Sequence, residues 1–357
     1  MKLRNFSRLL LFAFVIMCIA PSCVKEGPMG PAGANGTNGT NGTDGTNGAD
    51  GTAFCLDCHT EAKMNAVQTA WAGSVHATGT AFARASSADC APCHAAEGFI
   101  NFIERPTVAA VGITNPSHIT CEACHNGMHV TFDVATDGTD YALRTKAAVN
   151  VITDPGKTID LGGEANLCVN CHQSRTPFPA DSEQLNADGS VMDAAGNGTY
   201  AITSSHYGPH HGPQGNLLVG VGAGYEFTGS ANYPASGNTA TKHAEVGCTT
   251  CHMNSGSHAF TPSLASCTSC HGTLTDFDVN GFQTEIATLL EELKTKMDER
   301  GISAKVAAAK STAPAILSVT EARVFYNYTL IEEDRSEGAH NPKYIKALLQ
   351  NTIEALN

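Results

Sequence analysis

The sequence predicts a fold made mostly of loops and short helices, with a few short hairpins and a set of α-helices at the carboxyl end. Three observations support this class. Gly, Asn, Ser and Ala dominate long stretches, helical apolar periodicity is confined to residues 276–357, and a cysteine–histidine motif recurs six times before them. Aromatic residues make up only 6% of the chain. A chain with this much loop therefore needs apolar material beyond its own side chains to build a core.

The recurring motif is C-x-x-C-H, and its six copies account for every cysteine after Cys23. The copies are Cys55, Cys58 and His59; Cys90, Cys93 and His94; Cys121, Cys124 and His125; Cys168, Cys171 and His172; Cys248, Cys251 and His252; and Cys267, Cys270 and His271. Two thiols three positions apart reach the two vinyl groups of one porphyrin, and the histidine that follows binds the iron. We expect six covalently bound haem c groups with these histidines as proximal iron ligands. The fold class is then a multihaem cytochrome, with loops and short helices wrapped on a haem stack.

Other uses of paired cysteines fit this pattern less well. C-x-x-C pairs also bind zinc or carry out thiol–disulfide exchange, but neither use requires a histidine directly after every second cysteine. Disulfide bonds would leave the six histidines unexplained. The regularity of all six copies favours haem.

Nine histidines lie outside the motifs, and they are the source of the second axial iron ligands. We expect these distal ligands among His76, His118, His129, His211, His243, His258 and His340. In the segment His206–His211 we expect one ligand and favour His211 over His206 and His210, whereas the role of His129 is left open. Imidazole on both faces keeps the iron closed to substrate, which suits electron transfer.

The amino-terminal residues 1–22 have the pattern of a lipoprotein signal peptide. Three positive residues, Lys2, Arg4 and Arg8, precede the apolar run Leu9–Ala20, which is too short to cross a hydrocarbon core of ~30 Å as a helix. Small residues then lead into Cys23, so we expect cleavage before Cys23 and acylation of its thiol. Ala20 stands where a leucine is typical, which leaves an ordinary signal peptide as the alternative.

Residues 23–53 form the predicted lipid anchor and a collagen-like tether. Glycine recurs at every third position from Gly27 to Gly51, the period that a collagen triple helix requires. Only Pro28 and Pro31 stiffen the repeat. The segment is therefore interpreted as a flexible spacer, with a trimeric stalk as the alternative.

The haem-binding region is expected over residues 54–275 and a helical segment that packs on it over 276–357. Asp137-Gly138 and Gly196-Asn197-Gly198 predict hairpins within 130–143 and 191–202, with long loops from Pro179 to Val246. In the last segment, helical spacing runs from Ile286 to Met297 and ends at Gly301. Ser318-x-x-Glu321 predicts a capping box for a second helix, and Asn341-Pro342 predicts the start of a third.

Two segments resemble a known superfamily. The segment Ser336–Leu349, with His340-Asn341-Pro342, resembles the C-terminal His-Asn-Pro helix of pentahaem nitrite reductases and octahaem hydroxylamine-oxidoreductase relatives. The resemblance implies that His340 is a distal ligand. The segment Cys121–His129 is similar to the related Cys-Glu-x-Cys-His-Gly-Pro-Gly-x-x-His segment with a shorter spacing, which implies the same role for His129. The Cys-x-x-Cys-Lys motif of the nitrite reductases is absent from the sequence, so the resemblance implies haem packing and not a particular reaction.

The net charge limits the classes of partner that the protein is expected to bind. Removal of residues 1–22 takes away three positive charges and changes the formal net charge from −13 to −16, which disfavours nucleic acid. We expect an exported outer-membrane lipoprotein, facing the periplasm or the cell surface, that exchanges electrons with redox partner proteins or extracellular acceptors. One alternative is an oxidoreductase that acts on a small nitrogen or sulfur compound at one five-coordinate haem. The other is a subunit of a haem-lined trimer or filament.

The lipid anchor leads to a testable prediction. Replacement of Cys23 by serine removes the acylated thiol and should release the protein from the membrane fraction, because no later stretch of the sequence is apolar enough to insert. Fractionation followed by absorption spectroscopy would measure this, and the haem spectrum should not change. A wild-type protein that is already free of the membrane would contradict the anchor.

Overall fold

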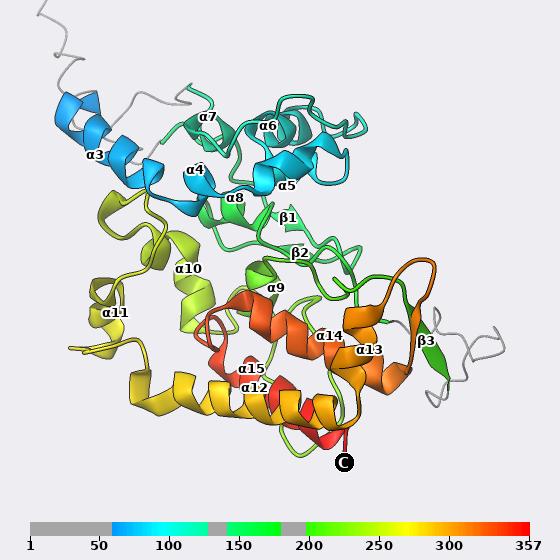
Figure 1. Ribbon diagram of the computed structural model, residues 1–357. Coiled ribbons are helices and arrows are strands. Elements are labelled where there is room, and N and C mark those ends of the chain that lie inside the picture. Colours follow the sequence, from blue (N-terminus) through cyan, green and yellow to red (C-terminus); the bar gives the residue numbers. More distant parts are fainter. Residues whose placement is uncertain (1–58, 128–140, 180–197) are drawn as a thin grey trace, which may run out of the picture. The chain divides into compact units, whose positions relative to one another are not determined.

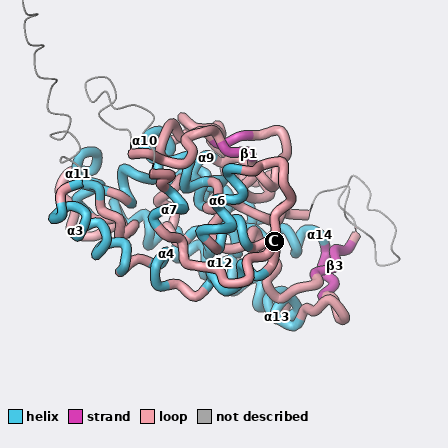
Figure 2. The backbone as a smooth tube through the Cα atoms, turned by 90° about the horizontal axis from the view of Figure 1, so that it is seen from above, coloured by secondary structure: helices cyan, strands magenta, loops and turns pink. Residues whose placement is uncertain are grey.

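The computed structural model describes residues 59–127, 141–179 and 198–357. The chain divides into two units, Met1–Gly51 and Thr52–Asn357, and the first lies wholly outside the described residues. In the second unit, helices joined by loops account for most of the described chain and strands are few (Figures 1 and 2). No helix among the described residues is both long and apolar enough to span a bilayer.

Each of the five described C-x-x-C-H motifs lies on or at the end of a short helix. The helices are α5 (Ala91–His94), α7 (Cys121–Cys124), α8 (Ala165–Val169), α10 (Lys242–His252) and α11 (Leu264–His271). In the first three, the histidine N–H donates to the carbonyl of the first cysteine at 2.9–3.1 Å. Each of these motifs therefore forms one helical turn, which projects its two thiols and its imidazole from a single compact unit.

Other short helices connect the motif helices. They are α3 (Glu61–Ala72), α4 (Val75–Thr78), η1 (Ala81–Ser86), α6 (Ala96–Glu104), α9 (Gln214–Val219), η3 (Asn254–Gly256) and η4 (Val279–Gly281). Helix α6 packs tightly on α5 at Gly98, where a Cβ atom would lie 2.0 Å from the carbonyl oxygen of Ala91. Only glycine fits there, so this position fixes how closely α6 approaches the second motif.

Three of the carboxyl-terminal helices follow the sequence prediction: α12 (Phe282–Glu299), α14 (Val319–Asp334) and α15 (Pro342–Glu354). A fourth, α13 (Ile302–Ala308), was not predicted. The capping box of α14 is confirmed, because Ser318 and Glu321 exchange hydrogen bonds between side chain and backbone. Asn341 caps α15 by accepting from the Tyr344 N–H, also as predicted.

These helices lie together (Figure 1). They enclose the largest apolar core of the described residues. The core includes Leu293 of α12, Tyr326 of α14 and Leu348 of α15, together with Ile202 and Leu217 from the preceding region. Residues from 198–227 therefore share one core with the carboxyl-terminal helices. As a result, the end of α14 and the start of α15 are held firmly beside residues 198–227.

A buried amide stabilises this arrangement. Asn327 of α14 accepts from the Tyr225 N–H at 2.9 Å, and its amide donates to the Tyr225 carbonyl at 2.8 Å and to Thr352 Oγ1 at 2.9 Å. Asn327 and Thr352 are fully buried. The polar groups of three segments are thereby satisfied inside the core, where an unpaired group would cost about 1–3 kcal/mol.

The sheet structure differs from the prediction. Strand β3 (Thr199–Ile202), the described part of the hairpin predicted at 191–202, pairs antiparallel with β4 (Ala315–Ser318) of the carboxyl-terminal segment. A second pair, β1 (Val149–Asn150) with β2 (Thr158–Ile159), was not predicted. Of the hairpin predicted at 130–143, only residues 141–143 are described, and Leu143 forms an antiparallel bridge with His125.

The loop predicted between Pro179 and Val246 also contains helices. Helix α9 lies inside it, and α10 begins there at Lys242. Helix α9 follows Pro213 and ends at Gly220, whose φ of 66° suits the left-handed C-cap position. Its apolar residues Leu217, Leu218 and Val219 are buried. A single turn of this kind is too short for helical periodicity to be recognised in the sequence.

The shared core can be tested with a matched pair of substitutions. Ile345 of α15 is fully buried and Ile316 of β4 is 48% exposed. Replacement of Ile345 by alanine should lower the free energy of unfolding by about 2–5 kcal/mol, because it leaves a cavity. Ile316→Ala should cost far less. Guanidinium unfolding followed by far-UV circular dichroism would measure both, and equal losses would contradict the core assignment.

Candidate functional site

Histidine side chains meet in pairs across the second unit. In each of five pairs, a motif histidine faces one histidine from outside the motifs, with ring centres 6.0–6.4 Å apart. The pairs are His94 with His210 at 6.0 Å, His125 with His258 at 6.3 Å, His172 with His76 at 6.2 Å, His252 with His340 at 6.4 Å and His271 with His243 at 6.0 Å. Five of the six motifs therefore have a second imidazole at nearly the same distance.

This spacing fits a metal ion between two imidazoles. A metal–imidazole bond is about 2 Å long and the ring centre lies about 1 Å beyond the nitrogen, so two axial imidazoles have ring centres about 6 Å apart. The angles between ring planes range from 33° to 85°. Rotation about the axis leaves the two bonds intact, so these different angles are all compatible with axial binding.

The other ring nitrogen of most paired histidines is held by a hydrogen-bond acceptor. Nδ1 contacts a backbone carbonyl in four of them, a side-chain amide oxygen in one and a carboxylate in one. The acceptors are Tyr141 for His125, Phe260 for His252, Gly256 for His258, Ala339 for His243, Gln214 for His172 and Asp334 for His340. Each acceptor keeps the proton on Nδ1 and leaves Nε2 free to bind a metal ion.

Burial keeps several of these imidazoles neutral, which is the form that binds a metal. Burial, and then the neighbouring His172, lowers the pKa of His76 to about 4. Burial also lowers the pKa of His94, His210 and His258. At His340 burial acts in the same direction, but the Asp334 carboxylate outweighs it and raises the pKa.

The segment 206–211 departs from the sequence prediction, which favoured His211. The ring beside His94 belongs to His210, whereas His211 Nδ1 lies 2.7 Å from the Glu333 carboxylate and its side chain is 65% exposed. Backbone geometry explains the difference. His210 has a left-handed φ of 73°, and Pro209 before it accepts a hydrogen bond from the Arg175 N–H at 2.8 Å.

The remaining predicted residues have other surroundings. The ring of His118 packs against Phe82, with ring centres 4.1 Å apart. Cys55, Cys58 and His129 lie outside the described residues, so their roles stay predictions. His59 is described and lies two residues before the start of α3.

The motif cysteines lie next to one another across the fold. The Cys171 thiol lowers the pKa of Cys93, and the Cys248 thiol lowers that of Cys168, so the members of each pair are neighbours. Cys124 packs in one apolar cluster with Cys171. The motif Cys168–His172 is therefore adjacent to three others: 90–94, 121–125 and 248–252.

The fifth and sixth motifs are neighbours as well. Burial, and then the nearby thiols of Cys267 and Cys270, raises the pKa of Cys251. Helices α10 and α11, which carry these motifs, also pack against each other. The five described motifs thus form one connected set, with 168–172 in the middle and 267–271 at one end.

Phe260 lies where three of the pairs come close together. Its ring is 4.8 Å from that of His76 and 5.8 Å from that of His258, and its carbonyl oxygen lies 2.9 Å from Nδ1 of His252. Its φ of 55° is in the left-handed region, which is strained for a bulky residue. No sequence pattern pointed to this residue.

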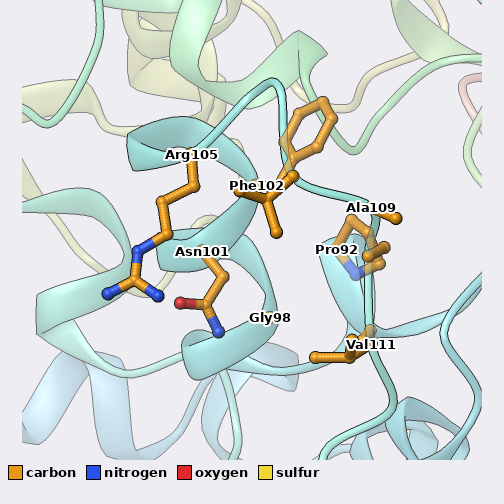
Figure 3. A pocket seen from close by; sticks show the side chains of 10 residues that line it. Pro92, Gly98, Asn101, Phe102, Arg105, Ala109 and Val111 are labelled. Carbon is orange, nitrogen blue, oxygen red and sulfur yellow. The ribbon is translucent and has the colours of Figure 1, made fainter.

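A small pocket lies beside the second motif. It has a volume of about 100 Å³ and is lined by Ala91 and Pro92 of that motif, by α6 and by residues 105–111 (Figure 3). Asn101 and Arg105 supply polar groups to a mostly apolar lining. The pocket contains no histidine. Elsewhere among the described residues, no group of three or more His, Cys, Asp or Glu side chains gathers as a metal site.

Comparison with known proteins gives two similar structures. No protein-family model and no curated protein matches the chain. The outer cell wall cytochrome OcwA aligns over 81% of this chain and 50% of its own length, with 19% identity and a TM-score of 0.48. An undecahaem cytochrome from the S-layer of Carboxydothermus ferrireducens aligns over 80% and 40%, with 17% identity and a TM-score of 0.45. The chain spans half or less of the length of these two cytochromes.

Proposed function

We propose that this protein is a six-haem c-type cytochrome that transfers single electrons outside the cytoplasm. The observation that carries the proposal is the set of five histidine pairs, each made of one motif histidine and one other histidine at 6.0–6.4 Å. An iron held between two such imidazoles is six-coordinate and changes its oxidation state by one electron.

The distal ligands follow from the pairs. We assign His76, His210, His243, His258 and His340 to this role. His210 replaces His211, because the His211 ring is engaged by Glu333. The motif Cys55–His59 remains to be matched, with His118 and His129 as the candidates from the sequence.

The contacts between motifs support a relay. The motif 168–172 adjoins three other motifs through Cys171, Cys168 and their neighbours. Electrons that enter at any of those three would therefore have a short path to the others. The motif 267–271 lies on exposed α11, which has no buried residue, and this makes it the candidate exchange point with an external partner.

Carriage of electrons is favoured over catalysis because a second imidazole is in place at each of the five described motifs. A second imidazole already faces each of the five described motif histidines, which leaves no open coordination position there for a substrate. The signal peptide and the tether, both outside the described residues, support attachment of the protein outside the cytoplasm through Cys23.

Haem content and spin state provide a direct test. The mature protein should exceed its apo mass by six haems and should release none on acid–acetone extraction, because twelve thioether bonds hold them. Its oxidised EPR spectrum should contain only low-spin iron. Four or fewer haems would overturn the stoichiometry. A high-spin iron that turns over nitrite or hydroxylamine would instead identify the protein as an enzyme.

Adjacent histidines provide a matched test of the ligand assignment. His210→Ala should keep all six haems but convert one iron to high spin and create a carbon monoxide site, because His94 loses its partner. His211→Ala, one residue away, should leave the EPR spectrum unchanged. The reverse result would restore His211 as the ligand, as the sequence favoured.

A further inference from the structure

We propose that Asp334 is a positioning residue that lowers the reduction potential of the haem on Cys248 and Cys251. It would do so through a hydrogen bond to the distal ligand His340. The proposal rests on the proposed function, because it requires His252 and His340 to bind the same iron.

The carboxylate and the imidazole are held in a fixed geometry. Asp334 Oδ1 lies 2.7 Å from Nδ1 of His340, and the Asp334 side chain is only 1% exposed. A carboxylate in this position accepts the Nδ1 proton. Nε2 of His340 is therefore the nitrogen that faces His252, whose ring centre is 6.4 Å away.

Neighbouring groups keep the pair in place. Ser336 Oγ donates to the second carboxylate oxygen of Asp334 and accepts from the His340 N–H. Asp334 ends α14, and His340 lies two residues before α15 begins at Pro342. Both helices belong to the large apolar core, so neither partner can move away from the other at low cost.

Asp334 also lies near a second motif. The Gln214 amide donates to the carbonyls of Glu333 and Asp334 at 3.3 Å, while its oxygen lies 3.1 Å from Nδ1 of His172. Gln214 thus links the end of α14 to His172 of the central motif. A substitution at Asp334 would therefore alter a region where two neighbouring motifs meet.

Asp334 is the exceptional acceptor among the described ligands. The other Nδ1 acceptors are backbone carbonyls or the neutral amide of Gln214. A negative charge on Nδ1–H pushes electron density onto Nε2, which makes the ligand more basic. A more basic ligand stabilises ferric over ferrous iron, so the one-electron reduction becomes less favourable while the proton stays on Nδ1.

The experiment uses the full six-haem protein and redox titration followed by EPR. His340→Ala first identifies the low-spin signal of this haem as the one it converts to high spin. Asp334→Asn keeps a hydrogen-bond acceptor but removes the charge. It should raise the midpoint potential of that signal by about 59 mV, which corresponds to a tenfold change in the one-electron equilibrium constant. An unchanged midpoint would overturn the proposal.

Glu333→Gln is the matched control, because it removes the same charge one residue away from a carboxylate that pairs with His211. It should leave this midpoint potential unchanged. A shift equal to that of Asp334→Asn would mean that the loss of any nearby negative charge causes the effect, and not the hydrogen bond to His340. Should Asp334→Asn fail to assemble, Ser336→Ala tests the same bond. It removes a donor to the carboxylate and should move the midpoint downward, so no shift there would count against the proposal. If His340→Ala produces no high-spin iron, the ligand assignment itself fails.

Discussion

The structure depends on one repeated constraint, the separation of about 6 Å between two imidazole rings that one metal ion would bridge. The paired histidines are far apart in the sequence, as in His76 with His172 and His125 with His258. Each pair therefore ties a motif turn to another segment of the chain. In a chain with few strands and short helices, these ties and the porphyrins between them would replace much of the ordinary side-chain core.

The carboxyl-terminal helices supply the rigid part of the design. Their apolar core fixes the end of α14 and the start of α15, and with them Asp334 and His340. Gln214, whose side-chain oxygen contacts His172, donates a hydrogen bond to the Asp334 carbonyl at the end of α14. One conventional helical core thus positions His340 and the Gln214 side chain beside His172, whereas the His243–His271 pair lies on the separate helices α10 and α11.

The sequence predicted the features that local patterns determine. The α14 capping box and the Asn341 cap are confirmed, because each depends on residues within a few positions. The pairing of β3 with β4 was not predictable, since it joins segments over a hundred residues apart. Nor was the placement of the His210 ring beside His94, which accompanies a left-handed backbone at His210 and the contact of His211 with distant Glu333.

The neighbouring thiols have a consequence for biogenesis. Cys93 meets Cys171 and Cys168 meets Cys248 inside the folded chain. If these cysteines carry the proposed haems, attachment before the segments close on one another would keep cysteines of different motifs apart. A chain that folded without haem outside the cytoplasm would instead bring together cysteines from different motifs in an oxidising compartment. Cross-linking of these cysteines would block the thiols that the proposed haems need, so haem supply would then limit how much of the chain matures.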